Sequence, residues 1–486
     1  MKDNIVLVSN RGPVSFRATI DGFDTKRGAG GLAGALDPVA RRLGDNAIWI
    51  AAANSEDDRK ALAGGAVQAV REELGYPIRL LDIDPDTYDR YYNNVSNRML
   101  WFANHCLWDE LDITGFGDEE LDAWNNAYEP VNRLFADTVA EVAVDDALVL
   151  FQDYHLATAP GYLREQAQQV AIAHFTHSSF CGPRGLEVLP QPIPSRVIEG
   201  MLGADLLGFH TGDWVKGFLQ SCEGLGADVD YERGTVDHSG RRTWVRAYPI
   251  PIDGVELRER AATEVVQQWA ERFSVYTDLP LVVRADRAEI SKNVVRGFEA
   301  FGALLDRRGD LRGEVRFVAC LYPSRESMPE YRDYMEQISA VVEKINERHP
   351  GSIELFFRDD YDRTLGALMN YDVLLVNSIM DGMNLVSKEG PTVNRREGVL
   401  VLALGAGSFE ELGEYAVPID DPYDIEETAA AIETALAMDM DDRKRRGEGL
   451  RSIVEARTPG DWIESQLTDL SEIGDGRAPS TPASRL

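Results

Sequence analysis

Short runs of apolar residues alternate along the chain with longer segments in which apolar and polar residues are mixed. Runs rich in Val, Ile and Leu and bounded by polar residues are typical of buried strands, whereas the mixed segments are typical of helices. The pattern predicts strands at residues 4–10, 46–52, 147–155, 170–177, 204–211, 244–252, 279–286, 315–323, 352–358, 371–378 and 398–404. Strands that alternate with helices indicate βαβ units, so we expect an α/β protein with parallel sheets.

The strand and helix pattern runs through both halves of the chain, which indicates two domains. A chain of 486 residues is too long for one compact core, so two domains of roughly 200 to 250 residues each are expected. Pro249 and Pro251 predict an extended linker in "YPIPIDGVE". We therefore predict two facing, doubly wound domains at residues 1–250 and 251–470. Residues 471–486 are rich in Pro and Ser and poor in apolar groups, which predicts a disordered tail.

Composition excludes several classes of partner. The chain has 82 Asp and Glu against 50 Lys and Arg, a formal net charge of −32, and nucleic-acid binding needs a basic surface. No apolar stretch approaches the ~18 residues of a membrane span, and the N-terminus enters a strand without a signal-peptide pattern. Four scattered cysteines contain no C-x-x-C pair, so neither a zinc knot nor a disulfide framework is indicated. We expect a cytoplasmic protein with no nucleic-acid or membrane partner.

The segment "NSIMDGMNLVSKEG" follows the apolar run "YDVLLV" directly. In open α/β sheets, ligands bind at the carboxyl ends of the strands, and a following helix directs its first N–H groups toward them. Such a loop suits a phosphate group, with Asp381 placed to bond a hydroxyl and Glu389 to bond a ribose diol. An ordinary loop with surface charges is an equally weighted alternative for this stretch taken alone.

Cations follow other predicted strands. Arg287 and Lys292 lie five residues apart after the run "LPLVV", so both could converge on a diphosphate, the arginine as a fork and the lysine as a point charge. Arg11 follows the first strand, and Gly28, Gly30 and Gly31 precede a helix-like run, where glycines would let the backbone approach an anion. A plain flexible loop is the alternative for the glycines, and surface cations for the pair.

Polar and aromatic residues mark further strand ends. Arg325 follows "VRFVACL", Asp153 follows "ALVLF", and His177 follows "VAIA". A lone histidine is more often structural than catalytic, but polar strand ends in adjacent βα units favour a functional interpretation. Tyr92 and Trp101 could flank a sugar ring or a phosphate, although bulky aromatics are mostly core residues. Zinc-protease, serine-hydrolase and P-loop motifs do not occur.

Many short motifs occur together in one order: "SNR", "GGL", "YYNNVSNRMLW", "DYHL", the histidine after the fourth strand, "GFHT", "YPIPI", "SK" five residues after an arginine, "PSR" and "DGMNLVSKE". In this order they resemble the trehalose-6-phosphate synthases, which are retaining glycosyltransferases of family 20, along nearly the whole chain apart from the tail. "KEGPTVNRREGVLVL" is similar to an actinobacterial-type subgroup. The resemblance implies the GT-B architecture, two facing Rossmann-like domains with the active site in the cleft between them.

The resemblance also implies a role for each matching residue. The N-terminal domain would bind the acceptor and the C-terminal domain the nucleotide sugar. The implied acceptor ligands are Arg11, Tyr92, Trp101 and Arg325 for the phosphate of glucose 6-phosphate and Asp153 for its hydroxyls. The implied donor ligands are Gly31, Arg287 and Lys292 for the diphosphate, with the backbone of Leu385 and Val386, Glu389 for the ribose, and His177 and Asp381 for the glucose. Arg287, Lys292, His177 and Asp381 would form the catalytic group.

The implied reaction transfers glucose from UDP-glucose or GDP-glucose to glucose 6-phosphate with retention, without a metal or other cofactor. The chain departs from the family in "HSSFCGP", in "IAAANSED" and at Met380, and these departures leave other acceptors open, as in glucosylglycerol-phosphate or validoxylamine-phosphate synthases. A non-catalytic sugar-phosphate sensor is a third hypothesis. A separate trehalose-phosphate phosphatase is expected in the pathway, and the trehalose that it releases would serve osmoprotection. A homo-oligomer is a further option.

Overall fold

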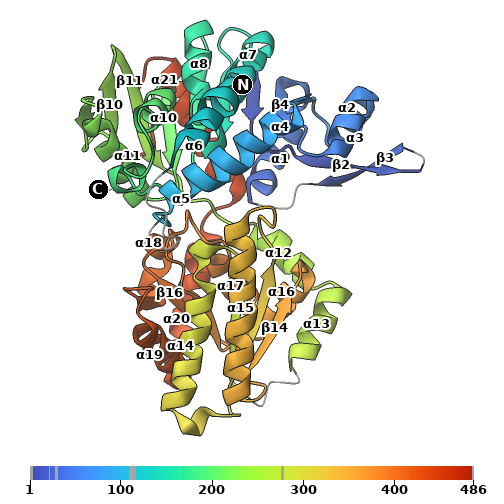
Figure 1. The fold of residues 1–486 in the computed structure, drawn as a ribbon, viewed down its shortest axis with the longest axis vertical. Coiled ribbons are helices and arrows are strands. Elements are labelled where there is room, and N and C mark those ends of the chain that lie inside the picture. Colours follow the sequence, from blue (N-terminus) through green and yellow to red (C-terminus); the bar gives the residue numbers. More distant parts are fainter. Residues whose placement is uncertain are drawn as a thin grey trace. The chain divides into compact units, whose positions relative to one another are not determined.

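The computed structural model describes residues 4–20, 22–27, 31–108, 116–167, 169–274 and 279–483, and its helices and strands are labelled in Figure 1. They divide into two compact units. Unit 1 consists of Met1–Ile250 together with Pro459–Leu486, and unit 2 consists of Pro251–Thr458. The chain passes from unit 1 to unit 2 between Ile250 and Pro251, inside the proline-containing linker that the sequence predicted.

Unit 1 is built on a nine-stranded sheet with the order β5-β4-β1-β6-β7-β8-β11-β10-β9 among the described residues. Its strands are β1 (Ile5–Val8), β4 (Ala47–Ala52), β5 (Ile78–Leu81), β6 (Leu148–Gln152), β7 (Ala171–Phe175), β8 (Leu206–Phe209), β9 (Asp228–Asp230), β10 (Thr235–His238) and β11 (Arg241–Ala247). The strands from β5 to β11 pair in parallel, and β10 and β9 add an antiparallel edge. Val8 pairs with both Ile50 and Phe151, which places β1 at the centre of the parallel part.

Helices cover this sheet because their apolar faces need a buried partner. In unit 1 they are α1 (Gly31–Leu43), α2 (Glu56–Ala63), α3 (Ala66–Leu74), α4 (Pro85–Asp89), α5 (Trp101–Asn104), α6 (Asp118–Ala123), α7 (Glu129–Val142), α8 (Ala159–Gln166), α9 (Pro183–Leu186), α10 (Ile193–Met201), α11 (Gly212–Gly224) and α21 (Pro459–Gly474), with a π-helical segment at Arg90–Leu100. α7 and α10 both pack on α8, whereas α1 packs on α21, which contacts β6, β7 and β8. A separate hairpin of β2 (Val14–Thr19) and β3 (Gly22–Arg27) projects from the unit (Figure 1).

Unit 2 contains a parallel sheet of six strands with the order β14-β13-β12-β15-β16-β17 among its described residues. The strands are β12 (Leu281–Arg287), β13 (Arg316–Tyr322), β14 (Ile353–Phe357), β15 (Val373–Val376), β16 (Val399–Ala403) and β17 (Val417–Ile419). Val282 pairs with Phe317 on one side and with Val373 on the other, so β12 is central. The order reverses between β12 and β15, and a reversal of this kind is where doubly wound sheets bind ligands.

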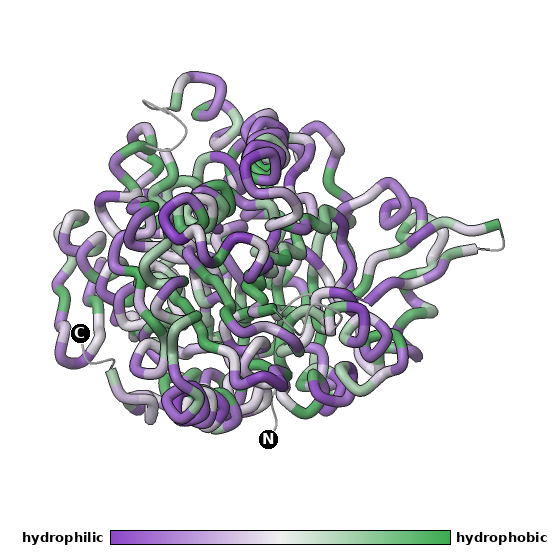
Figure 2. Tube along the Cα trace, turned by 90° about the horizontal axis from the view of Figure 1, so that it is seen from below, coloured by the Kyte–Doolittle hydropathy of each residue, from purple (hydrophilic) through white to green (hydrophobic). Residues whose placement is uncertain are grey.

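Two groups of helices enclose the sheet of unit 2. The helices are α12 (Gly254–Ala261), α13 (Glu264–Ser274), α14 (Val294–Arg307), α15 (Pro329–Arg348), α16 (Tyr361–Leu368), α17 (Val386–Val393), α18 (Phe409–Leu412), α19 (Ile425–Ala437) and α20 (Met440–Glu455). α15 and α19 pack against α14, whereas α12, α16 and α20 pack against α17. Leu281 and Val283 of β12 face the second group in a core shared with Leu257 and Leu365. Figure 2 shows the hydrophobic segments gathered in the interior of the trace.

The apolar runs located all eleven of the strands that they predicted. The sheet of unit 2 is parallel as expected, whereas the sheet of unit 1 is parallel from β5 to β11 and carries an antiparallel edge at β10 and β9. β5 and β17 were missed, as were the polar strands β2, β3, β9 and β10. The hairpin strands carry mostly exposed side chains, so no apolar run marks them. β9 and β17 have three residues each, too few for a periodic signal.

The C-terminal segment corrects the predicted domain boundaries. Residues 459–470 were assigned to the second domain, but α21 belongs to unit 1. The indole Nε1 of Trp462 donates to the backbone oxygen of Tyr248 at 2.9 Å, and Tyr248 Oη donates to Asp469 Oδ2 at 2.6 Å. The predicted disordered tail is also fixed as far as residue 483. Asp469 Oδ1 accepts from the Thr481 backbone N–H at 3.0 Å, and the Thr481 carbonyl accepts from Arg246.

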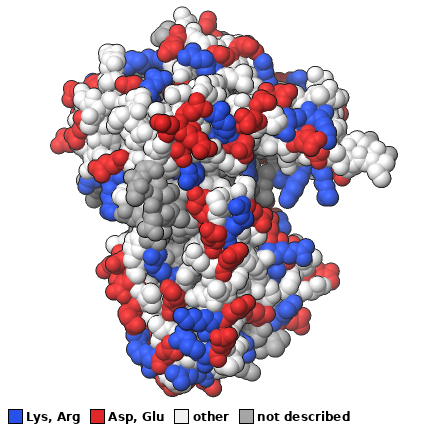
Figure 3. Space-filling model, viewed as in Figure 1, with Lys and Arg blue, Asp and Glu red and all other residues white. Residues whose placement is uncertain are grey.

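The surface is acidic and mixed. Acidic and basic side chains are interspersed over the face shown in Figure 3, in keeping with the formal net charge of −32. Within the described part of the chain, no helix combines the length and the apolar composition that crossing a bilayer requires.

Trp462 tests whether α21 anchors the sheet of unit 1. We expect Trp462→Ala to lower the free energy of unfolding by about 3–5 kcal/mol, because it leaves a cavity where a buried indole packs edge-on against Phe175. Urea unfolding followed by circular dichroism measures the change. Ser465→Ala, at an exposed position of the same helix, is the control and should change this free energy by less than about 0.5 kcal/mol. Equal effects of the two substitutions would contradict the anchoring role.

Candidate active site

Lys292 and Asp381 meet at the carboxyl ends of the strands in unit 2. Lys292 ends the 3₁₀ turn Ile290–Lys292 after β12, and Asp381 lies in the loop after β15. Lys292 Nζ donates to Asp381 Oδ2 and lies 3.9 Å from Asp286 Oδ1. Burial lowers the pKa of Lys292, but the two carboxylates outweigh burial, and the pKa lies above its ordinary value. The lysine is therefore a fixed cation at neutral pH.

Arg287 and Arg325 lie on either side of one carboxylate. Arg287 is the last residue of β12, and Arg325 follows β13. Arg287 Nη1 lies 3.0 Å from Glu289 Oε1, and Arg325 Nη1 donates to Glu289 Oε2. Arg287 is 38% exposed, whereas the side chain of Glu289 is fully buried. The strand end therefore holds two arginines and a lysine on buried carboxylates, an arrangement suited to phosphate groups.

The loop after β15 leads into the N-terminus of α17. Asn384 Oδ1 accepts from the Ser387 backbone N–H at 3.0 Å, which caps the helix, and Asn384 Nδ2 donates to Asp381 Oδ2 at 3.0 Å. Leu385 and Val386 stand at the start of this helix, where N–H groups have no partner within a helix and favour anions. The loop passes so close to Gly405 that a side chain would not fit at this position. A Cβ on Gly405 would lie 2.0 Å from the carbonyl oxygen of Ile379.

Glu389 lies in α17, four positions after Leu385. Tyr361 Oη donates to Glu389 Oε1 at 3.3 Å. Burial raises the pKa of Glu389 to about 7, against the lowering effect of the Tyr361 hydrogen bond. Its charge therefore changes close to neutral pH.

In unit 1, Arg11 and Tyr92 form a second group. Arg11 Nη2 donates to Tyr92 Oη at 2.8 Å, and the guanidinium carbon lies 5.6 Å from the centre of the Tyr92 ring. The Tyr92 ring stacks on His155 and on Tyr88, with centroid distances of 5.6 and 5.5 Å. The exposed arginine is thus held beside an aromatic surface and close to the end of β6.

Asp153 follows β6 with a backbone φ of +71°, a conformation that few residues other than glycine adopt. Asp153 Oδ1 accepts from the backbone N–H groups of Tyr154 and His177, at 3.1 and 3.2 Å. The His177 ring donates from Nε2 to Gln152 Oε1 at 2.9 Å. Burial and the neighbouring His210 and His174 hold the pKa of His177 well below its ordinary value, so its ring is neutral.

Trp101 and Gly31 are the remaining predicted residues of unit 1. The Trp101 ring lies beside the ring of Tyr154, with centroids 5.7 Å apart. Trp101 is only 8% exposed and packs against the His105 ring, with centroids 3.9 Å apart. Gly31 is the first residue of α1, and Gly28 and Gly30 lie outside the described residues.

The structure therefore gathers the predicted residues into two sets. Unit 1 holds Gly31, Arg11, Tyr92, Trp101, Asp153 and His177, and unit 2 holds Arg287, Lys292, Arg325, Asp381, Leu385, Val386 and Glu389. Arg325, an implied acceptor ligand from the second half of the chain, lies beside Arg287 in unit 2, where both arginines contact Glu289. The individual roles stay predictions.

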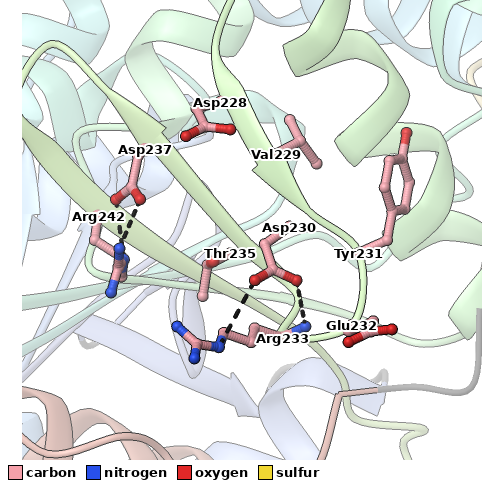
Figure 4. Close-up of a pocket in the computed structure, with 9 residues that line it drawn as sticks. All are labelled: Asp228, Val229, Asp230, Tyr231, Glu232, Arg233, Thr235, Asp237 and Arg242. Atoms are coloured by element: carbon pink, nitrogen blue, oxygen red, sulfur yellow. Dashed lines mark hydrogen bonds and ion pairs between the residues drawn. The ribbon is translucent and has the colours of Figure 1, made fainter.

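A polar hollow of about 480 Å³ lies elsewhere, at the antiparallel edge of unit 1 (Figure 4). It is lined by acidic side chains of β9 and β10, and Asp237 and Asp230 pair there with Arg242 and Arg233. None of the predicted site residues lines it.

A comparison with known families matches residues 3–472 to the model of "Glycosyltransferase family 20". The match covers nearly the whole chain. This chain belongs to glycosyltransferase family 20.

Several family members and solved structures are similar over most of their length. The validamine 7-phosphate valienyltransferase of Streptomyces hygroscopicus subsp. jinggangensis is 30% identical over 436 residues, 88% of this chain and 86% of that protein. The alpha,alpha-trehalose-phosphate synthase [UDP-forming] of Schizosaccharomyces pombe is 30% identical, over 96% and 90% of the two chains. The crystal structure of such a synthase from Burkholderia vietnamiensis has a TM-score of 0.79 at 26% identity, covering 96% and 99%. A trehalose-6-phosphate structure from E. coli, bound with UDP-2-fluoro glucose, has a TM-score of 0.80 at 25% identity, with the same coverage. The fold is accordingly GT-B.

Two residues of the site escaped the sequence analysis. Glu289 contacts the predicted residue Arg287, and Gln152 contacts the predicted residue His177. Both could have been found from their position, since Gln152 ends β6 and Glu289 lies between Arg287 and Lys292. The contacts of Glu289 with Arg325 and of Gln152 with His177 join different elements, however, and sequence spacing does not show them.

Lys292 tests the buried charges of unit 2. We expect Lys292→Met to lower the free energy of unfolding by about 3–5 kcal/mol at pH 8, because Asp381 loses its cation and Asp286 keeps only Arg284. The loss should be smaller at pH 5. Burial already holds the pKa of Asp286 above its ordinary value, and loss of Lys292 raises it further, so the variant loses stability as pH increases. Urea unfolding at both pH values measures the difference. The exposed Lys344 supplies the control variant Lys344→Met, and a pH-independent loss at Lys292 would contradict this explanation.

Proposed function

We propose that this chain transfers glucose from a nucleoside diphosphate glucose to glucose 6-phosphate with retention, forming trehalose 6-phosphate. The observation that carries the proposal is the group of Arg287, Lys292 and Asp381 beside the N-terminus of α17. In a member of family 20, this set supplies two cations, helix N–H groups and a hydroxyl ligand, which a sugar nucleotide requires. The UDP-forming synthases among its relatives support the same reaction.

The cations supply electrostatic catalysis in this proposal. Negative charge develops on the departing diphosphate, and Arg287 and Lys292 are already held in place by Glu289 and Asp381. Preorganised charges of this kind lower the barrier without reorganisation during the reaction. The leaving phosphate oxygen takes the proton of the attacking hydroxyl, so the reaction requires no protein base and no metal. His177 acts as a neutral hydrogen-bonding ligand of the donor glucose, in keeping with its low pKa.

Acceptor recognition follows the ligands that the sequence implies. Arg11, Tyr92 and Arg325 supply donors for the phosphate of glucose 6-phosphate, with Trp101 flanking it. Asp153 binds the sugar hydroxyls through the carboxylate oxygens that its unusual backbone conformation orients. Gly31, at the N-terminus of α1, lies against the donor diphosphate.

One comparison favours a second candidate for the acceptor. A relative that covers most of this chain is named a validamine 7-phosphate valienyltransferase, so a cyclitol phosphate is an alternative acceptor. Fold and donor chemistry do not decide between them. The nucleotide base, the actinobacterial-type subgroup, a cytoplasmic location, homo-oligomer formation and a separate trehalose-phosphate phosphatase stay predictions of the sequence.

Nucleotide release tests the proposed reaction. The purified protein is incubated with UDP-, GDP- or ADP-glucose, each with and without glucose 6-phosphate, and nucleoside diphosphate is measured. We expect release that depends on glucose 6-phosphate and is fast with one donor. Arg287→Ala should lower kcat/KM by at least about a hundredfold, a loss in the range of one oxyanion-stabilising donor, whereas Arg332→Ala on the exposed surface of α15 should not change it.

Other outcomes separate the alternatives. Release with validamine 7-phosphate or glycerol 3-phosphate, but not with glucose 6-phosphate, would replace the acceptor and keep the donor chemistry. Binding of both ligands without any release would favour a sugar-phosphate sensor.

Glu389 predicts a pH dependence of donor binding. As a carboxylate it accepts hydrogen bonds from the ribose hydroxyls, and its pKa of about 7 in the unliganded protein means that protonation competes with the donor. We expect the donor KM to rise as pH falls below 7, by up to about tenfold per unit. Steady-state kinetics between pH 5.5 and 8.5 measure this, and Glu389→Gln should raise the KM and remove its pH dependence. An unchanged pH profile in the variant would show that another group titrates.

A further inference from the structure

Glu289 is the point at which four side chains of unit 2 converge. Its Oε1 accepts from Ser324 Oγ at 2.8 Å and lies 3.0 Å from Arg287 Nη1. Its Oε2 accepts from Tyr331 Oη at 3.1 Å and from Arg325 Nη1. The two carboxylate oxygens therefore serve two different arginines, one at the end of β12 and one after β13.

The carboxylate stays charged in spite of its burial. Burial raises the pKa of Glu289, but Arg287 and Arg325 outweigh this effect and hold the pKa at about 2. A guanidinium presents its N–H donors in a rigid planar fork, so fixing one edge of the fork fixes the direction of the others.

Arg325 depends on this contact for its orientation. Its backbone has a φ of +47°, a strained conformation for a side chain of this size that surrounding contacts must maintain. Tyr331 Oη accepts from Arg325 Nη1 at 2.8 Å and donates a hydrogen bond to Glu289 Oε2 at 3.1 Å, which closes a ring of three side chains. The Arg325 side chain is only 10% exposed as a result.

We propose that Glu289 is a positioning residue that orients both phosphate-binding arginines. One carboxylate then fixes the direction of Arg287 toward the donor diphosphate and of Arg325 toward the acceptor phosphate. The inference rests on the proposed function, which assigns Arg287 to the donor and Arg325 to the acceptor. Because the two arginines share one anchor, a disturbance of Glu289 affects the binding of both substrates.

Loss of the Glu289 charge could change phosphate binding in either direction, and the direction distinguishes two explanations. A carboxylate beside a cation also competes with phosphate for that cation, so loss of its charge could strengthen binding by simple electrostatics. Positioning predicts the opposite, because a mobile arginine has to be ordered again when the phosphate binds. The two explanations therefore differ in the direction of the change.

Isothermal titration of the full chain tests the proposal, with UDP, GDP and glucose 6-phosphate as the probes. We expect the near-isosteric Glu289→Gln to raise the Kd of the preferred nucleoside diphosphate and the Kd of glucose 6-phosphate by at least about tenfold each. Asp372→Asn is the matched control. Asp372 lies between Arg396 and Arg443, at 3.0 and 3.8 Å, but it precedes β15, at the opposite end of the strand from Asp381. The control should leave both Kd values within about twofold.

A double-mutant cycle distinguishes positioning from a general loss of structure. If Glu289 acts through Arg287, then Glu289→Gln should not weaken nucleotide binding further in an Arg287→Ala background, yet it should still weaken the binding of glucose 6-phosphate. In an Arg325→Ala background, Glu289→Gln should weaken nucleotide binding and leave the binding of glucose 6-phosphate unchanged. A general structural effect would instead add to both single substitutions. Should Glu289→Gln fail to fold, Tyr331→Phe tests the same anchor and should raise the Kd of glucose 6-phosphate alone.

Tighter binding of either ligand to Glu289→Gln, unchanged binding of both, or additive effects in the cycle would each overturn the positioning role while leaving the proposed function intact. A wild-type chain that binds neither the nucleotides nor glucose 6-phosphate would instead overturn the proposed function, and the inference with it.

Discussion

The pairing of buried charges at the carboxyl ends of β12 and β13 is the constraint on which the site of unit 2 depends. An ammonium or carboxylate placed there without a partner would cost several kcal/mol. Lys292 is therefore paired with Asp381, and Arg284 donates to Asp286 at 2.9 Å. The loop after β15 has to reach Lys292 to supply Asp381, and this requirement fixes the close approach at Gly405 and the entry into α17. In the proposed reaction, cations held in this manner bind the diphosphate without reorganising.

Unit 1 presents its candidate residues by different means. Its arginine is exposed and rests on a stack of aromatic rings, and its carboxylate is oriented by backbone N–H groups instead of cations. His177 is kept neutral and is directed by Gln152. Hydroxyl groups of a sugar need oriented acceptors and donors more than they need charge, and this unit supplies them. The difference between the units agrees with the proposed reaction, in which unit 1 binds sugar hydroxyls and unit 2 binds the charged leaving group.

Family membership and chemistry answer different questions about this chain. The relatives include a trehalose-phosphate synthase and a validamine 7-phosphate valienyltransferase, each 30% identical to this chain. The strand-end cations suit any nucleoside diphosphate donor, so they define the reaction class. In the proposed reaction the acceptor sugar contacts Asp153, and the loop after β7 is held in place by Ser179 Oγ, which donates to the Asn104 carbonyl at 2.9 Å.

The sequence by itself determined the parallel strands and the polar residues at their ends. Burial on both faces requires continuous apolar runs, and ligands of such sheets lie where the strands stop. Arg287, Lys292, Asp381 and Glu389 could therefore be identified from position alone. Only the tertiary structure decided that α21 belongs to unit 1, through a bond between Tyr248 and Asp469, 221 residues apart, and that Glu289 anchors two arginines from different strands. Both depend on long-range contacts, which the spacing of residues along one chain does not encode.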